Sequence, residues 1–218
     1  MTSSLLAAAL ARTPLVAILR GVTASEAEEV GAELVAAGIR VLEVPLNSPD
    51  PYDSIRVLRD TLGDSAVVGA GTVVTSGDVQ RVLDAGGQIV VAPNTDERVI
   101  EACLRRDLVP VPGIATASEA FRAISAGATF LKLFPVNAFA PSYAGALAAV
   151  LPAGISVLAV GGVDRTNCRT YLDAGYRGLG IGSSLYRPGS TVGQLRKHAE
   201  EFVRICRDWQ GDLEPGRT

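Results

Sequence analysis

Residues 128–135 read Ala-Thr-Phe-Leu-Lys-Leu-Phe-Pro, an apolar run that contains a single cation, Lys132. Runs of this length that are hydrophobic without alternation are typical of strands buried on both faces of a sheet. The chain contains eight such runs, and longer segments with helical periodicity separate them. They lie near residues 15–20, 39–45, 66–71, 88–92, 108–112, 128–134, 155–160 and 178–182. Eight alternating strand and helix units predict an α/β fold, a parallel (β/α)8 TIM barrel.

The ends of the chain add a helix and a tail to this prediction. An apolar segment over 5–11 predicts an extra N-terminal helix, and a helical pattern from Val192 to about Arg207 follows the eighth strand. We therefore predict a single barrel domain over residues 1–208. Residues 209–218 are polar and rich in Gly and Pro, so we expect a disordered tail there.

A sequence repeat divides the expected barrel into two halves. Thr-Ala-Ser-Glu-Ala occurs at 23–27 and again at 116–120. In both copies the Thr and the Glu three residues later can form a capping box that begins a helix. Both helices are expected to end at an Ala-Gly pair, with Gly38 and Gly127 in the left-handed conformation.

Each copy of the repeat is followed by a charged residue within an apolar strand. Glu43 stands five residues after Gly38, and Lys132 stands five residues after Gly127. Because four units separate the copies, the two side chains are expected on opposite sides of the barrel and in one layer. A chance recurrence of a common capping pattern is the alternative.

Composition argues for a small-molecule partner. The 218 residues carry 20 basic and 23 acidic side chains and a net charge of −3, with 5% aromatic residues. This balance favours neither nucleic-acid nor membrane binding, and there is no uncharged apolar stretch near 20 residues. Three scattered cysteines, Cys103, Cys168 and Cys206, favour reduced thiols and a cytoplasmic location.

Active sites of TIM barrels lie at the C-terminal ends of the strands, which gives a list of candidates. These residues are Arg20, Glu43, Thr72, Pro93–Asn94, Gly113, Lys132, Gly161–Gly162 and Gly182–Ser183. The glycines after strands 7 and 8 stand where such barrels bind phosphate through backbone N–H groups. The alternative is that these glycines only form tight turns.

Three charged residues predict the chemistry. A desolvated Lys132 amine is a nucleophile toward a carbonyl carbon, unless its stem packs while its head reaches water. Glu43 nearby is expected to move protons, the alternative being a buried ion pair with the lysine. The guanidinium of Arg20 suits a substrate carboxylate, or else a rim salt bridge. The only histidine, His198, is expected on the surface of the last helix, so neither a metal nor another cofactor is expected.

Five ordered motifs resemble one enzyme family. They are Ala-Ile-Leu-Arg-Gly at 17–21, Val-Leu-Glu-Val-Pro-Leu-Asn-Ser-Pro at 41–49, Gly-Ala-Gly-Thr-Val at 69–73, Leu-Lys-Leu-Phe-Pro at 131–135 and Ala-Val-Gly-Gly-Val at 159–163. The chain is similar from about residue 14 to 205 to the class I aldolases of 2-keto-3-deoxy-6-phospho sugar acids. The resemblance implies a homotrimer that splits a phosphorylated sugar acid into pyruvate and D-glyceraldehyde 3-phosphate.

The resemblance also implies roles for individual residues. It makes Lys132 the Schiff-base residue that binds substrate covalently and Glu43 the acid/base. Thr72 would help to hold the pyruvate carboxylate. The phosphate would bind to Gly162, Gly182 and Ser183.

Two positions indicate a branch of that family. Gluconate-type members carry Glu-x-Thr-x-Arg on the second strand and a threonine before the later glycine pair. This chain has Asn47 and Val160 at the specificity positions, which resembles the galactonate branch, where Arg20 can replace the missing arginine. The alternatives are a 2-dehydro-3-deoxy-6-phosphogluconate or 4-hydroxy-2-oxoglutarate aldolase, a phosphate-binding barrel isomerase or thiamine-phosphate-type barrel, and a non-catalytic sugar-phosphate binder.

Overall fold

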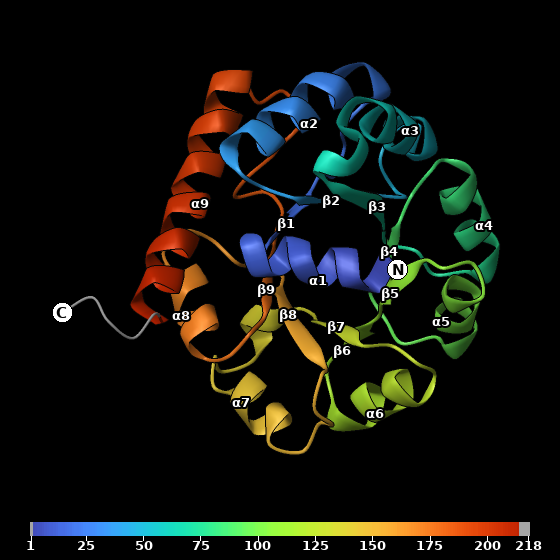
Figure 1. Ribbon diagram of the computed structural model, residues 1–218, viewed down its shortest axis with the longest axis vertical. Coiled ribbons are helices and arrows are strands. Elements are labelled where there is room, and N and C mark those ends of the chain that lie inside the picture. The colour runs from blue at the N-terminus through green and yellow to red at the C-terminus, as the bar shows by residue number, and fades with distance from the viewer. Residues whose placement is uncertain (1, 214–218) are drawn as a thin grey trace.

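The computed structural model describes residues 2–213 and contains a ring of parallel strands with helices around it (Figure 1). The strands are β1 Leu15–Ile18, β2 Val41–Pro45, β3 Val67–Gly71, β4 Ile89–Val91, β5 Val109–Val111, β6 Gly113–Ile114, β7 Phe130–Leu133, β8 Ser156–Val160 and β9 Gly178–Ile181. The helices are α1 Thr2–Arg12, α2 Ala24–Ala37, α3 Pro51–Leu62, α4 Ser76–Asp84, α5 Glu97–Leu104, α6 Ala117–Ser125, α7 Tyr143–Ala148, α8 Cys168–Asp173 and α9 Val192–Leu213, with short 3₁₀ helices at Gly63–Ser65 and Val136–Ala138. The predicted barrel with an extra N-terminal helix is confirmed.

The fifth strand, predicted near residues 108–112, is found as two short strands, because Pro112 separates β5 from β6, which lies beyond the predicted end. The strand order is β5-β4-β3-β2-β1-β9-β8-β7-β6, so β5 pairs with β4 and β6 pairs with β7. Proline has no N–H to donate to the ladder. Its carbonyl accepts the backbone N–H of Lys132 at 2.9 Å, which brings the two halves of the strand to opposite neighbours.

The repeated helix signals are confirmed in both halves. The carboxylate of Glu26 accepts the backbone N–H of Thr23 at 3.1 Å, and that of Glu119 accepts the backbone N–H of Thr116 at 2.9 Å. Gly38 and Gly127 follow the two helices with φ of +112° and +100°. Each helix therefore begins and ends where local sequence chemistry predicts.

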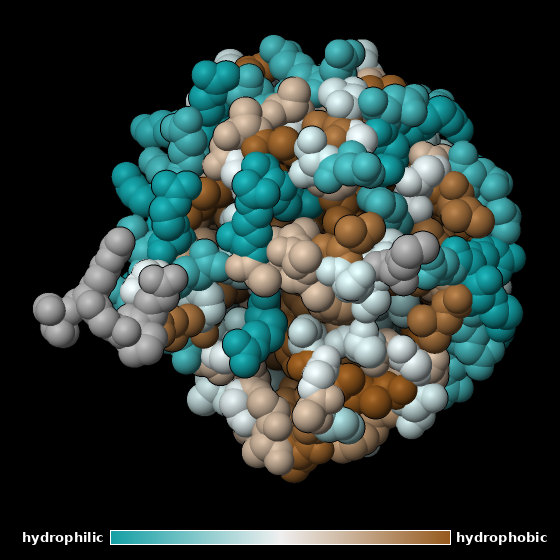
Figure 2. Space-filling model, in the orientation of Figure 1, coloured by the Kyte–Doolittle hydropathy of each residue, from teal (hydrophilic) through white to brown (hydrophobic). Residues whose placement is uncertain are grey.

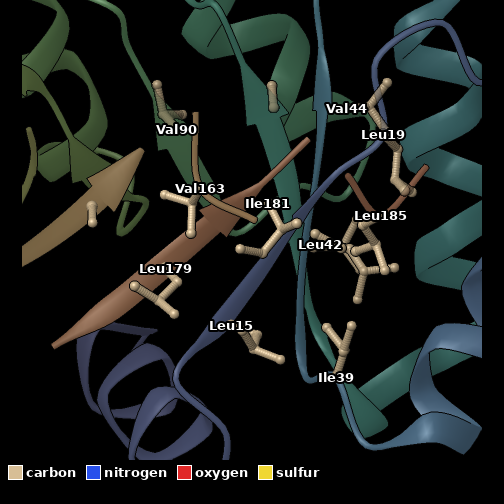
Figure 3. Close-up of a cluster of buried hydrophobic side chains, with 14 of the residues drawn as sticks. Leu15, Leu19, Ile39, Leu42, Val44, Val90, Val163, Leu179, Ile181 and Leu185 are labelled. Carbon is tan, nitrogen blue, oxygen red and sulfur yellow. The ribbon is translucent and has the colours of Figure 1, made fainter. Parts of the chain in front are cut away.

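Residues of one strand alternate between two apolar clusters. On β2, Leu42 and Val44 belong to the outer cluster between strands and helices, part of which is shown in Figure 3. Val41 belongs to the inner cluster inside the ring. The period of two then turns Glu43 inward, and the same pattern on β7 turns Lys132 inward between Leu131 and Leu133 of the outer cluster.

The tail predicted over residues 209–218 is partly wrong and partly outside the described residues. Helix α9 continues to Leu213, so the expected tail begins too early. Trp209 packs against the outer cluster and the side-chain amide of Gln210 donates to the carbonyl of Ala11 at 2.8 Å, contacts that stabilise the last turns. Residues 214–218 lie outside the described residues. No helix within residues 2–213 is long and apolar enough to cross a membrane.

Candidate active site

Glu43 and Lys132 face the same small cavity inside the barrel. Their exposed fractions are 2% and 7%, and Val160 lines the cavity with them. The other lining residues are apolar side chains and one glycine: Leu6, Val16, Ile18, Val41, Ile89, Val91, Val111, Leu158 and Gly180. The cavity volume is about 10 Å³, which is room for one water at most.

This burial changes the proton affinity of both groups. It raises the pKa of Glu43 to about 7, against the opposing charges of Lys132 and Arg20. It lowers the pKa of Lys132, an effect that Arg20 reinforces and Glu43 opposes. Near neutral pH the carboxyl can therefore both accept and donate a proton, and the fraction of uncharged, nucleophilic amine is increased.

The Glu43 carboxylate lacks a full set of partners. Within the described part of the chain, its Oε2 atom is buried and has no hydrogen-bond partner. The buried ion pair considered from the sequence is thus not formed through this oxygen. Buried polar atoms without partners are uncommon, and they concentrate where a ligand or water completes the site.

The Lys132 amine contacts an aromatic ring. Its Nζ atom lies 4.6 Å from the ring centroid of Phe134. The face of an aromatic ring stabilises the charged amine by about 0.5–2 kcal/mol. This contact opposes desolvation and fixes the direction in which the amine points.

Arg20 and Asn47 meet at the mouth of the barrel. Arg20 Nη1 donates to Asn47 Oδ1 at 2.5 Å, and both side chains are exposed. The next residue, Gly21, donates its N–H to the hydroxyl of Ser48 at 2.9 Å. The loops after β1 and β2 are therefore joined side by side, and the partner of Arg20 is an amide rather than the carboxylate of a rim salt bridge.

Thr72 follows β3 in a strained backbone conformation. Its φ is +58°, a region that β-branched residues rarely adopt, at a cost of about 1–3 kcal/mol. Thr72 and Asn47 line one polar cavity of about 580 Å³. Strain of this kind clusters at binding and catalytic sites. Here the strained residue, Thr72, shares a cavity with Asn47, which accepts the hydrogen bond of Arg20.

The glycine loops lie at the ends of β8 and β9. Gly161 and Gly162 have φ of +99° and +77°, and a side chain at Gly162 would come within 2.8 Å of Asn137. A side chain at Gly182 would meet nothing within 4 Å, so packing does not explain that glycine. Ser183 lines a second polar cavity of about 580 Å³, together with Ser184, Arg187 and His198 among others.

The other candidate residues at strand ends, Pro93–Asn94 and Gly113, pack against one another. A side chain at Gly113 would overlap the backbone of Pro93, and the N–H of Gly113 donates to the carbonyl of Asn94 at 3.2 Å. Residues 2–213 contain no group of three His, Cys, Asp or Glu able to hold a metal ion. His198, expected on the surface, is half-buried with Nδ1 3.4 Å from the carbonyl of Leu185.

Comparison with known proteins agrees with this geometry. A family model described as KDPG and KHG aldolase matches residues 6–197. The chain belongs to the KDPG and KHG aldolase family. It is therefore an aldolase, an enzyme that breaks a carbon–carbon bond.

Individual members of the family are similar over most of their length. The chain is 46% identical over 198 residues to the 2-dehydro-3-deoxy-6-phosphogalactonate aldolase of Escherichia coli strain K12, covering 90% of this chain and 96% of that one. A probable 2-dehydro-3-deoxy-6-phosphogalactonate aldolase of Rhizobium meliloti strain 1021 is 43% identical over 186 residues, covering 85% and 88%. A solved structure described as native KDPGal has a TM-score of 0.89 at 44% identity, covering 92% and 97%.

In this aldolase, sequence reasoning assigned no role to four residues that support the site. Phe134 could have been found, because it stands two residues after Lys132 in the same apolar run. Arg187 lies four residues after Ser183, and its Nε donates to the carbonyl of Ser183 at 2.8 Å. Gly71 and Ser48 act through contacts between segments distant in sequence. Sequence periodicity carries no signal for such contacts.

Proposed function

We propose that this member of the KDPG and KHG aldolase family is a class I aldolase that cleaves 2-dehydro-3-deoxy-6-phospho-D-galactonate into pyruvate and D-glyceraldehyde 3-phosphate. The observation that carries the proposal is the pairing of Glu43 and Lys132 in one small, largely apolar cavity that Val160 also lines. The names of the two galactonate relatives support the substrate.

The reaction begins at the amine of Lys132. The uncharged Nζ attacks the C2 ketone of the substrate, and the carbinolamine loses water to give a protonated imine. The Glu43 carboxylate then removes the proton of the C4 hydroxyl, through a water molecule. The C3–C4 bond breaks, its electron pair moves toward the imine nitrogen, and glyceraldehyde 3-phosphate leaves with its new aldehyde at C4.

The second half returns both groups to their starting state. The enamine bound to Lys132 takes a proton at C3 from the Glu43 carboxylic acid. Water then adds to the imine carbon and releases pyruvate, leaving a free amine. A carboxyl with a pKa near 7 can accept and later return that proton at neutral pH.

Residues at the mouth are assigned to the two ends of the substrate. Arg20, held by Asn47, and Thr72 would bind the carboxylate next to the ketone. Gly162, Gly182 and Ser183 would bind the phosphate, and the open space at Gly182 supports that role. Val160 presents a methyl surface where a hydroxyl would favour the other C4 epimer.

Borohydride reduction in the presence of pyruvate, followed by peptide mass spectrometry, tests the proposal. We expect the reduced pyruvyl adduct on the peptide of Lys132 and none in Lys132→Met. The chain supplies its own control, because the only other lysine in the sequence is the exposed Lys197 on α9. No adduct in folded protein would redirect the assignment to a phosphate-binding barrel, and faster cleavage of the gluconate epimer would redirect it to that substrate.

We also propose a homotrimer in the cytoplasm. The family resemblance supports the trimer, and three free, buried cysteines support a reducing compartment. Light scattering on the purified protein tests the assembly, and a monomeric mass would refute it. Fractionation of cells that express the chain tests the location.

A further inference from the structure

Helix α1 covers the N-terminal end of the barrel. It lies across the middle of the strand ring in Figure 1 and contacts β2, β3 and β5. The space-filling view from the same side shows atoms over the centre of this face (Figure 2). The helix is thus on the end opposite the loops that carry Arg20, Thr72 and the glycine pairs.

One residue of α1 reaches the cavity of the reactive pair. Leu6 is 1% exposed and lines the same cavity as Glu43 and Lys132. It belongs to the inner apolar cluster, with Val16, Val41 and Ile89 of three strands beside it in the cavity wall. Among the described residues that line the cavity, Leu6 is the one contributed by a helix, and all the others belong to strands.

We propose that Leu6 is a positioning residue for the aldolase reaction, because it seals the N-terminal end of the barrel and keeps bulk solvent from reaching Glu43 and Lys132 from that end. The inference rests on the proposed function, since it concerns how that same amine and carboxyl are kept reactive. Water admitted from this end would solvate the ammonium and the carboxylate, and both charged forms would become more stable.

In the described residues of α1, no charged side chain acts on the pKa of Glu43 or Lys132. Among residues 2–213, the charged groups that act on Glu43 are Lys132 and Arg20, and those that act on Lys132 are Glu43 and Arg20. The basic residue of α1, Arg12, stands in the last turn and acts on Arg40. For both members of the pair, burial is the largest cause of the pKa shift, and Leu6 contributes to burial.

The same helix provides a matched control. Leu10 is also a leucine of the inner cluster, with an exposed fraction of 5%. It is not among the residues that line the cavity of Glu43 and Lys132. It faces Gly178 at the start of β9, where an added side chain would come within 3.3 Å of it. Leu10→Ala therefore removes the same atoms from the same helix without opening that cavity.

The experiment measures borohydride trapping of pyruvate on Lys132 as a function of pH. We expect Leu6→Ala to move the trapping midpoint to higher pH by about one unit, so that trapping at neutral pH falls about tenfold. Leu10→Ala should keep the wild-type midpoint, and Leu6→Met, which refills the space, should restore it. Thermal unfolding of each variant shows that the protein is folded.

Three results of this experiment would overturn the inference about Leu6. A wild-type midpoint in folded Leu6→Ala, or an equal shift in Leu10→Ala, overturns the inference. If Leu6→Ala does not fold, Leu6→Val opens a smaller gap, and an unchanged midpoint in that variant also overturns it. Absence of trapping in the wild-type protein contradicts the proposed function itself, so the two failures are distinguishable.

Discussion

The carboxylate of Glu43 occupies the space that a side chain on residue 71 would need. Gly71 ends β3 and pairs with Pro45 of β2. A Cβ atom added there would overlap the Glu43 carboxyl group. Gly71 is therefore glycine because of this close approach, and the position of the proposed acid/base depends on it.

Gly71→Ala should reduce the turnover number by displacing Glu43 from its place opposite Lys132. Loss of a positioned general acid/base costs about 10²–10⁴-fold in rate, and we expect a reduction within that range. Trapping of pyruvate on Lys132 should persist. Steady-state kinetics and borohydride trapping measure the two effects. Gly193→Ala is the control, because a side chain there would meet nothing within 4 Å; equal activity in both variants would contradict the argument.

Glu43→Gln should remove both the proton transfer and part of the pH dependence of stability. The pKa of Glu43 is raised from 4.5 to about 7 in the folded protein, so the folded state binds more protons than the unfolded state between these values. The wild type should therefore lose stability from this group as pH rises from about 4.5 to 7, by up to about 3 kcal/mol.

Denaturant unfolding at pH 5 and pH 8 measures this effect. From pH 5 to pH 8, the free energy of unfolding of the wild type should fall relative to that of Glu43→Gln. Turnover should fall about 10²–10⁴-fold at every pH. A stability difference that does not change with pH would mean that the carboxyl of Glu43 titrates normally in the folded protein.

The barrel could be predicted because its strands are apolar runs, and the pairing of Glu43 with Lys132 could be predicted because a repeat places each of them five residues after a helix-ending glycine. Apolar runs located the strands, and the period of two along β2 and β7 turns Glu43 and Lys132 inward. The split of the fifth strand was missed because it depends on the neighbours that Pro112 contacts. The last turns of α9 were missed because Gln210 is held by Ala11, which is distant in sequence.

Loop contacts account for the rest of what the sequence did not reveal. Arg20 is predicted as a residue at the end of a strand and Asn47 as a specificity position of the family branch, and nothing in their spacing predicts the bond that joins them. The strained backbone of Thr72 is also invisible in sequence, because threonine is rarely found in that conformation. Contacts between βα loops are set by the barrel's closure rather than by any one segment.

Val160→Thr should change the preference between C4 epimers. Val160 lines the cavity with Glu43 and Lys132 and is 6% exposed. A threonine hydroxyl there can donate a hydrogen bond worth about 1 kcal/mol to a substrate oxygen. We expect the ratio of kcat/KM for the gluconate epimer to that for the galactonate epimer to rise about fivefold. Parallel assays with both epimers measure this ratio, and an unchanged ratio would remove Val160 from the specificity residues.

Arg20→Lys should weaken substrate binding more than it slows the chemical step. A guanidinium can bind a carboxylate through two N–H groups, which an ammonium cannot reproduce. We expect KM to rise about tenfold or more with a small change in kcat. Arg56→Lys is the control, because Arg56 is an exposed residue paired with Asp53.

Asn47 should act on the substrate carboxylate through Arg20, since its Oδ1 accepts from the guanidinium at 2.5 Å. Asn47→Ala alone should raise KM about fivefold, the equivalent of one hydrogen bond of about 1 kcal/mol. If the two residues act as a unit, Asn47→Ala should add little to Arg20→Lys in the double variant, because the bond it removes is already lost. Full additivity of the two KM effects would instead assign Asn47 its own contact with the substrate. The same kinetics on the two epimers would then show whether that contact lies at the carboxylate or nearer C4.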